Sequence, residues 1–306
     1  MSIEAIKKII HPIRASSGET YNSYYKTFVE FIETRNGKEL FPSSEVVEYF
    51  NKLVNKGFRV ATLKGVRSAL RDPLKFYFPN FDIVEDSCIK KLIQYVKSHN
   101  TRESVTFPAW NLDLVVRMLK LRDDNDLEFV FKKTLFLCFL ACPYRIAEFR
   151  AVSLSASSFS PLHALLKPHI AFQSKNQTYA FTPNPIIIQA YEEDSDICPV
   201  KLLNSYINIT QAKCREKGIE RPDQLWLNVN LKPISVFIMR KWIKEIIFMG
   251  DPNASSKLRV HSMRAQVASH LMVSGVSVKE ILSVMNWKQV STFSKFYARL
   301  GIRAAV

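Results

Sequence analysis

Four residue types near the end of this 306-residue sequence could do chemistry together. His261 and Arg264 are one helical turn apart in "HSMR", and Trp287 and Tyr297 follow them. Residues three apart on a helix project to the same side, and the first turn of a helix favours anions. Two cations at such a place predict an anionic ligand. Taken singly, the same residues are typical of a surface pair, a packing tryptophan and a core tyrosine with a hydrogen-bonded hydroxyl.

The charge of the whole chain indicates the class of anion. Lys and Arg total 43 against 28 Asp and Glu, so the formal net charge is +15. This excess favours nucleic acid first and an anionic membrane surface second, over a basic protein without such a partner. Hydrophobic residues make up 47% of the chain, which excludes a disordered class. The most apolar run, Leu135 to Cys142, is far shorter than the roughly 20 residues that a membrane span needs, and we expect no membrane partner.

The five cysteines do not predict a metal site. No pair has CxxC spacing, and Cys138 and Cys142 are four apart in an apolar helical segment. This spacing favours buried free thiols, which are typical of the reducing cytosol or nucleus. The N-terminus has no long apolar segment before a cleavage site, so we expect no secretory signal.

The elements that must position these residues are mostly helical. In the first hundred residues, apolar residues at helical spacing predict helices around 21–32, 46–53, 60–74 and 87–96. The third of these helices has an apolar side and a separate basic side, and Pro73 is expected to kink or end it. The basic side is formed by Lys64, Arg67, Arg71 and Lys75. It is either a solvated helix face or a face that contacts phosphates.

A polar stretch that breaks at Pro108 divides the chain into two domains, 1–103 and 104–306. In the second, a buried helix is followed by a break near Pro143 and a short helix. Residues 165–188 alternate apolar and polar residues on both sides of "SKNQ", which predicts a β-hairpin. Helices resume near Pro199. The fold class is therefore mainly α with a small antiparallel sheet: an N-terminal helical domain and an α+β C-terminal domain.

The last forty residues predict three short helices. Ser262 could cap the first, and Gly275 is expected to close it. Residues "SVKE" from Ser277 match a capping box that opens the second, whose buried face would include Val278, Ile281, Leu282 and Met285. The third begins near Ser291 or Thr292 and contains Tyr297.

Taken together, these residues resemble the tyrosine recombinases, or phage-type integrases. Arg145 and Glu148 in "CPYRIAEFRAVSL" are similar to the family's first arginine and its acidic neighbour, just before a three-stranded sheet. Lys175 lies at the hairpin tip, where the family has its catalytic lysine. The remaining matches are to the histidine, the second arginine, the histidine-or-tryptophan position and the nucleophile of the family. They fall on His261, Arg264, Trp287 and Tyr297.

This resemblance implies roles for the residues. The two arginines would clamp the oxygens of a DNA phosphate with forked donors. Tyr297 would attack phosphorus, and Lys175 would protonate the departing 5′-oxygen. His261 would take a proton, Trp287 would donate its indole N–H, and Glu148 would orient its neighbours. The family uses no metal or nucleotide cofactor, and its core-binding domain matches residues 1–103 by pattern.

The resemblance also implies partners and a place of action. The expected partners are double-stranded DNA and further copies of the chain, as a dimer or tetramer. The length and the "YR…AEFR" pattern resemble eukaryotic DIRS and Crypton elements, which implies the nucleus in a eukaryotic host and the cytoplasm otherwise.

The sequence departs from the family pattern at three places. "PYR" replaces the commoner "GLR" or "GMR", only nine residues follow Tyr297, and Lys167 is a second lysine near the hairpin with a better fit to a structural role. Two other functions stay open beside the active recombinase. One is a silent relative that only binds DNA, and the other is an enzyme similar to type IB topoisomerases.

Overall fold

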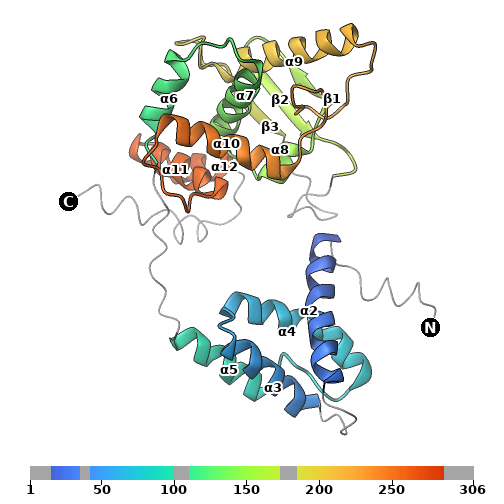
Figure 1. Ribbon diagram of the computed structural model, residues 1–306. Coiled ribbons are helices and arrows are strands. Elements are labelled where there is room, and N and C mark those ends of the chain that lie inside the picture. The colour runs from blue at the N-terminus through green and yellow to red at the C-terminus, as the bar shows by residue number, and fades with distance from the viewer. Residues whose placement is uncertain (1–14, 35–41, 100–109, 173–184, 286–306) are drawn as a thin grey trace. The chain divides into compact units, whose positions relative to one another are not determined.

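The computed structural model describes residues 15–34, 42–99, 110–172 and 185–285 (Figure 1). The chain divides into two compact units, Met1–Val105 and Thr106–Val306. Each unit has a hydrophobic core of its own. Among the described residues, no helix has the length and apolarity that crossing a membrane requires.

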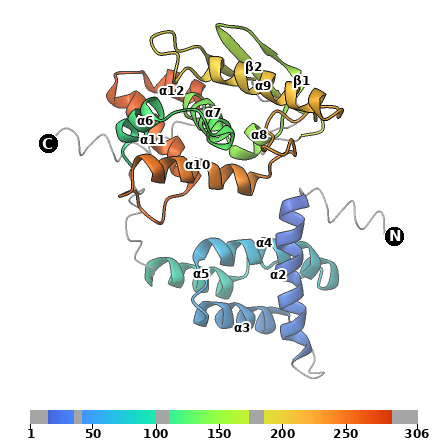
Figure 2. The ribbon, with the colours of Figure 1, turned by 45° about the horizontal axis from the view of Figure 1, so that its top comes forward.

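The first unit is a bundle of helices in its described part. These are α2 (Ala15–Glu33), α3 (Pro42–Asn55), α4 (Val60–Tyr77) and α5 (Ser87–His99). Helix α2 runs across α3 and α4 (Figure 2). Aromatic and aliphatic side chains from all four helices form the core, with Phe50, Leu63 and Ile89 fully buried. The helices expected from the apolar spacing are all present.

The sequence left open whether Pro73 kinks or ends the third predicted helix. The structure shows that helix α4 does not end there. It continues to Tyr77, with Pro73 inside the helix. A proline removes one backbone N–H, and here the loss falls within the last turns. Leu74 is buried in the core, and its carbonyl accepts the N–H of Phe78 at 2.8 Å. Packing of this turn against the core therefore outweighs the local preference of proline.

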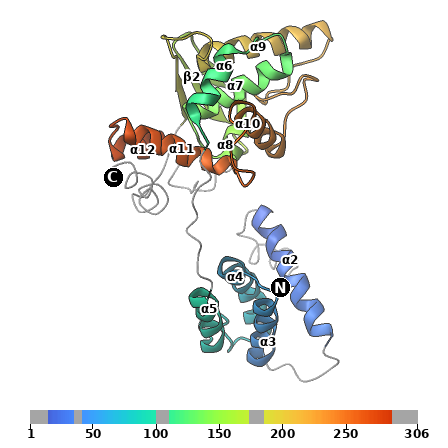
Figure 3. The same ribbon diagram turned by 60° about the vertical axis from the view of Figure 1, so that its left-hand side comes forward.

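The second unit places helices around a small sheet. Its helices are α6 (Leu112–Leu121), α7 (Leu127–Ala141), α8 (Ile146–Arg150), α9 (Pro199–Glu216), α10 (Val236–Gly250), α11 (Val260–Val273) and α12 (Val278–Val284). Helix α7 is buried along most of its length and packs against α9 and α10. Helix α11 packs against α10 and α12, and both α11 and α12 lie away from α9 (Figures 1 and 3). The expected fold class, mainly α with a small antiparallel sheet, is confirmed.

The sheet has the order β1-β2-β3 and is antiparallel throughout. Its strands are β1 (Val152–Phe159), β2 (His163–Pro168) and β3 (Ile186–Gln189). Strands β2 and β3 pair from His163 with Gln189 to Leu166 with Ile186, so the expected antiparallel pair is present. The tip of the hairpin, 173–184, lies outside the described residues. In β1 the register shifts between Ser153 and Ser158, which forms a bulge.

Helices α6 and α10 approach each other closely because α10 ends in glycine. A Cβ added at Gly250 would lie 2.5 Å from the Cα of Val115 on α6. Next to it, the buried carboxylate of Asp251 accepts the backbone N–H of Asn111 at 2.8 Å. The Asn111 side chain in turn caps α6 by accepting the N–H groups of Asp113 and Leu114. The last turn of α10 thus holds the first turn of α6.

The structure confirms most of the expected ends of α11 and α12 and corrects two details. Ser277 and Glu280 form the capping box, and Gly275 has φ +82 just after α11. Ser262, however, does not cap α11. The helix begins one turn earlier, and the Ser262 hydroxyl donates to the carbonyl of Arg259 at 2.6 Å. Val278 is 38% exposed, so it is not part of the buried face.

Candidate active site

Arg145 and Glu148 form an ion pair at the start of α8. Helix α7 is followed by the buried, non-helical residues Cys142 and Pro143. Arg145 has an extended backbone and occupies the N-cap position of α8. Three residues later in the helix, the Glu148 carboxylate accepts from Arg145 Nη1 at 3.0 Å. The Glu148 side chain is buried, whereas the Arg145 side chain is 29% exposed. Part of the Arg145 side chain therefore stays accessible when the pair is formed.

Arg264 lies on α11 and is almost fully buried, with 4% of its surface exposed. Its Nη2 donates to the carbonyl of Met285, just after α12, at 2.7 Å. The preceding residue, Met263, belongs to the large core of the unit. The following residue, Ala265, belongs to a small cluster with Ala268 and others between α11 and α12. Arg264 is thus flanked in the sequence by residues of two different apolar clusters.

Tyr144 directly precedes Arg145 and is buried. Its burial, and to a smaller extent Cys142 and the charge of Glu148, raise the pKa of the Tyr144 phenol to about 12, while the charge of Arg264 lowers it. Of the expected site residues, the structure pairs Arg145 with Glu148 on α8 and buries Arg264 on α11.

The remaining expected site residues are not described. Lys175, Trp287 and Tyr297 lie outside the described residues, as does the side chain of His261, although its backbone is in α11. Lys167 is described. It lies on β2, where its backbone N–H donates to the Ser157 hydroxyl at the β1 bulge.

The thiols near the site serve packing. Cys138 and Cys142 are both buried, as expected. The Cys142 thiol donates to the carbonyl of Ile187 on β3 at 2.7 Å, and burial raises the pKa of Cys142 to about 12. No group of three or more His, Cys, Asp or Glu side chains among the described residues could hold a metal ion.

The basic side of α4 is accessible. Lys64, Arg71 and Lys75 are exposed and Arg67 is half-buried. The apolar side of the same helix, with Leu63, Val66, Leu70 and Leu74, faces the core. Within the described part of the chain, none of the four cations forms an ion pair.

A second cationic face, which the sequence analysis missed, lies on α10. Phe237 is 72% exposed at the start of this helix. Arg240, Lys241 and Lys244 follow at spacings of three, four and seven, so they share its side of the helix. Lys241 has a long ion pair with Glu245 at 3.7 Å. The spacing of the cations in the segment "VFIMRKWIK" could have predicted this face.

Neither a protein-family model nor a curated protein sequence matches this chain. Solved structures do match. The integrase of the Tn1549 transposon, in complex with transposon right end DNA, has a TM-score of 0.63 and 12% identity over 98% of this chain and 97% of that one. The chain has the tyrosine-recombinase fold. A lambda integrase dimer bound to a COC′ core site shares this tyrosine-recombinase fold, with a TM-score of 0.59, 14% identity and coverage of 96% of this chain and 75% of that one.

Proposed function

We propose that the chain is a site-specific DNA recombinase or integrase that breaks and rejoins strands through a 3′-phosphotyrosyl intermediate. The observation that carries this proposal is the tyrosine-recombinase fold, in which α8 holds the Arg145–Glu148 ion pair and α11 holds the buried Arg264. In the proposal the two guanidinium groups converge on an anion with two nonbridging oxygens, which a DNA phosphodiester presents. Residues 1–103 would form the core-binding domain and residues 104–306 the catalytic domain.

The proposed step is a transesterification without an external energy source. The Tyr297 oxygen forms a bond to phosphorus while the bond from phosphorus to the 5′-oxygen breaks. The phenol proton passes to His261, because an unperturbed phenol has a pKa of about 10 and is a weak nucleophile at neutral pH. Lys175 gives a proton to the departing 5′-oxygen, and Trp287 donates its N–H to a phosphate oxygen. The reverse step joins a new 5′-hydroxyl and frees Tyr297.

In this proposal the arginines stabilise the charge that builds on the nonbridging oxygens in the pentacoordinate transition state. Arg264 is buried and Arg145 is largely so, and an ionic interaction is stronger in such surroundings than in water. Glu148 keeps the Arg145 fork in one orientation. Lys175, His261, Trp287 and Tyr297 enter by their match to the family pattern.

The proposed partners are double-stranded DNA and other copies of the chain. Structures of similar fold include a lambda integrase tetramer bound to a Holliday junction, with a TM-score of 0.57. A net charge of +15 and the cationic faces of α4 and α10 support DNA as the ligand. We further propose a mobile element of the DIRS or Crypton kind as the source, and action in the nucleus if the host is eukaryotic.

The deciding experiment traps the covalent intermediate. DNA is first selected by binding, and nicked forms of the selected sites are then incubated with the wild type and with Tyr297→Phe. Wild-type protein is expected to form an adduct that survives denaturation, and the variant is expected to form none. Tight binding without any adduct would indicate that the chain is a silent relative that only binds DNA. Relaxation of a supercoiled plasmid that lacks a selected site would favour the topoisomerase-like alternative.

The basic side of α4 is expected to contact phosphates. Replacing Arg67 and Arg71 by alanine should reduce the slope of log affinity against log salt by about 2, because each phosphate contact contributes about 0.9. Binding titrations at several salt concentrations measure this slope. Arg215→Ala with Lys217→Ala, near the end of α9, removes the same charge elsewhere and should change the slope less. Equal slopes for the α4 variant and the wild type would mean that this face contacts solvent and no phosphate.

A further inference from the structure

The cationic face of α10 carries an exposed aromatic ring. Phe237 is 72% exposed in the first turn of the helix. Arg240, Lys241 and Lys244 follow on the same side of the helix. Arg240 and Lys241 are exposed, and Lys244 is half-buried. At 1.5 Å per residue, the stripe from Phe237 to Lys244 is about 10 Å long. This surface therefore combines one apolar contact with three positive charges.

The helix that presents this stripe is held in place on its other sides. Helix α10 packs against α6, α7, α8 and α11. The Ser235 hydroxyl caps the helix by accepting the N–H of Ile238 at 3.2 Å. Arg150, at the end of α8, donates to the carbonyl of Ile234 at 3.3 Å, just before α10 begins. The start of α10, and with it the backbone of Phe237, is thus fixed next to the helix of the first proposed arginine.

The charges on this face indicate its partner. Among the residues that the structure describes, Arg240 and Lys244 form no ion pair, and the pair of Lys241 with Glu245 is long, at 3.7 Å. A protein surface that covered Phe237 would also take these cations out of water, which is costly unless each finds a countercharge. A DNA duplex supplies countercharges as regular rows of phosphates. The face therefore suits DNA better than an apolar protein surface.

The exposed ring indicates which part of the duplex is contacted. Base edges present mostly hydrogen-bonding groups, and the 5-methyl of thymine is the apolar group among them. This methyl lies in the major groove, which is about 12 Å wide and admits an α-helix. Phosphates follow one another about every 3.4 Å along a strand. With Phe237 against a thymine methyl, the cations of the stripe can therefore reach the phosphates of neighbouring base pairs.

We propose that α10 lies in the major groove of the bound DNA and that Phe237 selects thymine through its 5-methyl group. Arg240, Lys241 and Lys244 bind the flanking phosphates and so fix the register of the ring. The inference rests on the DNA-binding part of the proposed function. It adds a residue that determines which sequence is bound, and it does not depend on strand transfer.

Uracil substitution tests this contact at the level of one methyl group. Each thymine of a selected site is replaced in turn by uracil, and the affinity of the full chain is measured. The wild type should lose about fourfold in affinity at the contacted position, the effect of burying one methyl-sized apolar group. Phe237→Ala should bind the thymine and uracil forms equally. Phe237→Leu keeps an apolar side chain and should retain most of the difference.

Two further variants separate the ring from its surroundings. Leu121→Ala removes a 78% exposed apolar side chain at the end of α6 in the same unit, and it should respond to uracil as the wild type does. Lys241→Ala combined with Lys244→Ala should reduce the slope of log affinity against log salt by about 2. Phe237→Ala should leave this slope unchanged, because a phenyl ring displaces no counterions.

Three results would overturn the thymine contact. The first is a wild type that tolerates uracil at every position, and the second is an equal response of the wild type and Phe237→Ala. The third is a Phe237→Ala protein that loses self-association in size-exclusion chromatography and keeps its response to uracil, because the ring would then lie between protein copies. A wild type that binds the selected sites and forms no covalent adduct would instead overturn strand transfer and leave the thymine contact standing.

Discussion

Replacing Arg264 by alanine is expected to slow adduct formation by about 1,000-fold, the upper end of the effect of removing one donor that stabilises a transition-state charge. The Arg264 side chain is almost fully buried, and in the proposed function it binds the same phosphate as Arg145. Arg264→Lys keeps one charge but loses the planar fork, and we expect a loss of about 100-fold. DNA affinity should change little, because it depends on many cations among the 43 of the chain.

Single-turnover trapping measures these rates, and circular dichroism shows that the variants are folded. This check matters because Arg264 also donates to the carbonyl of Met285, so its loss removes a link between α11 and the end of α12. Arg215→Ala, in the last turn of α9, removes an exposed arginine and should react at the wild-type rate. A folded Arg264→Ala protein that reacts as fast as Arg215→Ala would exclude Arg264 from the catalytic step.

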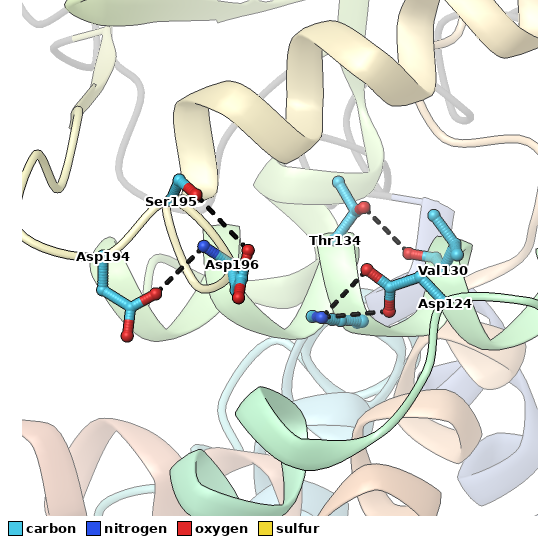
Figure 4. A network of polar contacts seen from close by, with 7 residues as sticks. Asp124, Val130, Thr134, Asp194, Ser195 and Asp196 are labelled. Atoms are coloured by element: carbon cyan, nitrogen blue, oxygen red, sulfur yellow. Dashed lines mark hydrogen bonds and ion pairs between the residues drawn. The ribbon is translucent and has the colours of Figure 1, made fainter.

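Replacing Asp124 by asparagine is expected to lower the free energy of unfolding of the second unit by about 3 kcal/mol. Lys133 is a lysine on the buried helix α7, and its side chain is 2% exposed. Its Nζ donates to both carboxylate oxygens of Asp124 at 3.0 Å (Figure 4). Asparagine would leave a buried ammonium group without its countercharge. We take the lower end of the usual range because Asp124 is 42% exposed and water can reach it.

The partner variant makes this prediction specific. Lys133→Met combined with Asp124→Asn removes the charge as well as its partner, and it should recover most of the loss. Asp123→Asn, on the exposed neighbouring carboxylate, should stay within about 0.5 kcal/mol of the wild type. Urea unfolding gives all the values. If the double variant is as unstable as Asp124→Asn alone, the lysine charge is not the cause.

Local sequence signals predicted the elements well where the energetics are local. The capping box of Ser277 and Glu280 joins residues three apart, so its pattern is complete in the sequence. Ser262 was assigned wrongly for a related reason. Serine is favourable both as a cap and as a donor to a carbonyl within the first turn, and the sequence does not tell the two apart.

Contacts between distant segments could not be predicted from the sequence. The need for glycine at position 250 depends on Val115, and the bond from Arg264 to Met285 spans a turn and a second helix. The ion pair of Arg145 and Glu148 joins residues three apart, so both members are visible in one short sequence segment. The catalytic roles of Arg145, Glu148 and Arg264 stay predictions. Those of Lys175, His261, Trp287 and Tyr297 stay predictions as well.

The small cluster between α11 and α12 has a consequence for heat inactivation. Its buried members are Ala265, Val267, Ala268, Ile281 and Met285, which is far less apolar surface than the main core of the unit holds. Segments with few buried contacts open at a lower free energy than the rest of a domain. Amide hydrogens of α11 beyond Arg264 should therefore exchange with solvent before those of α7. If the proposed function holds, strand transfer would then be lost on warming at a temperature where the sheet and α7 are still folded.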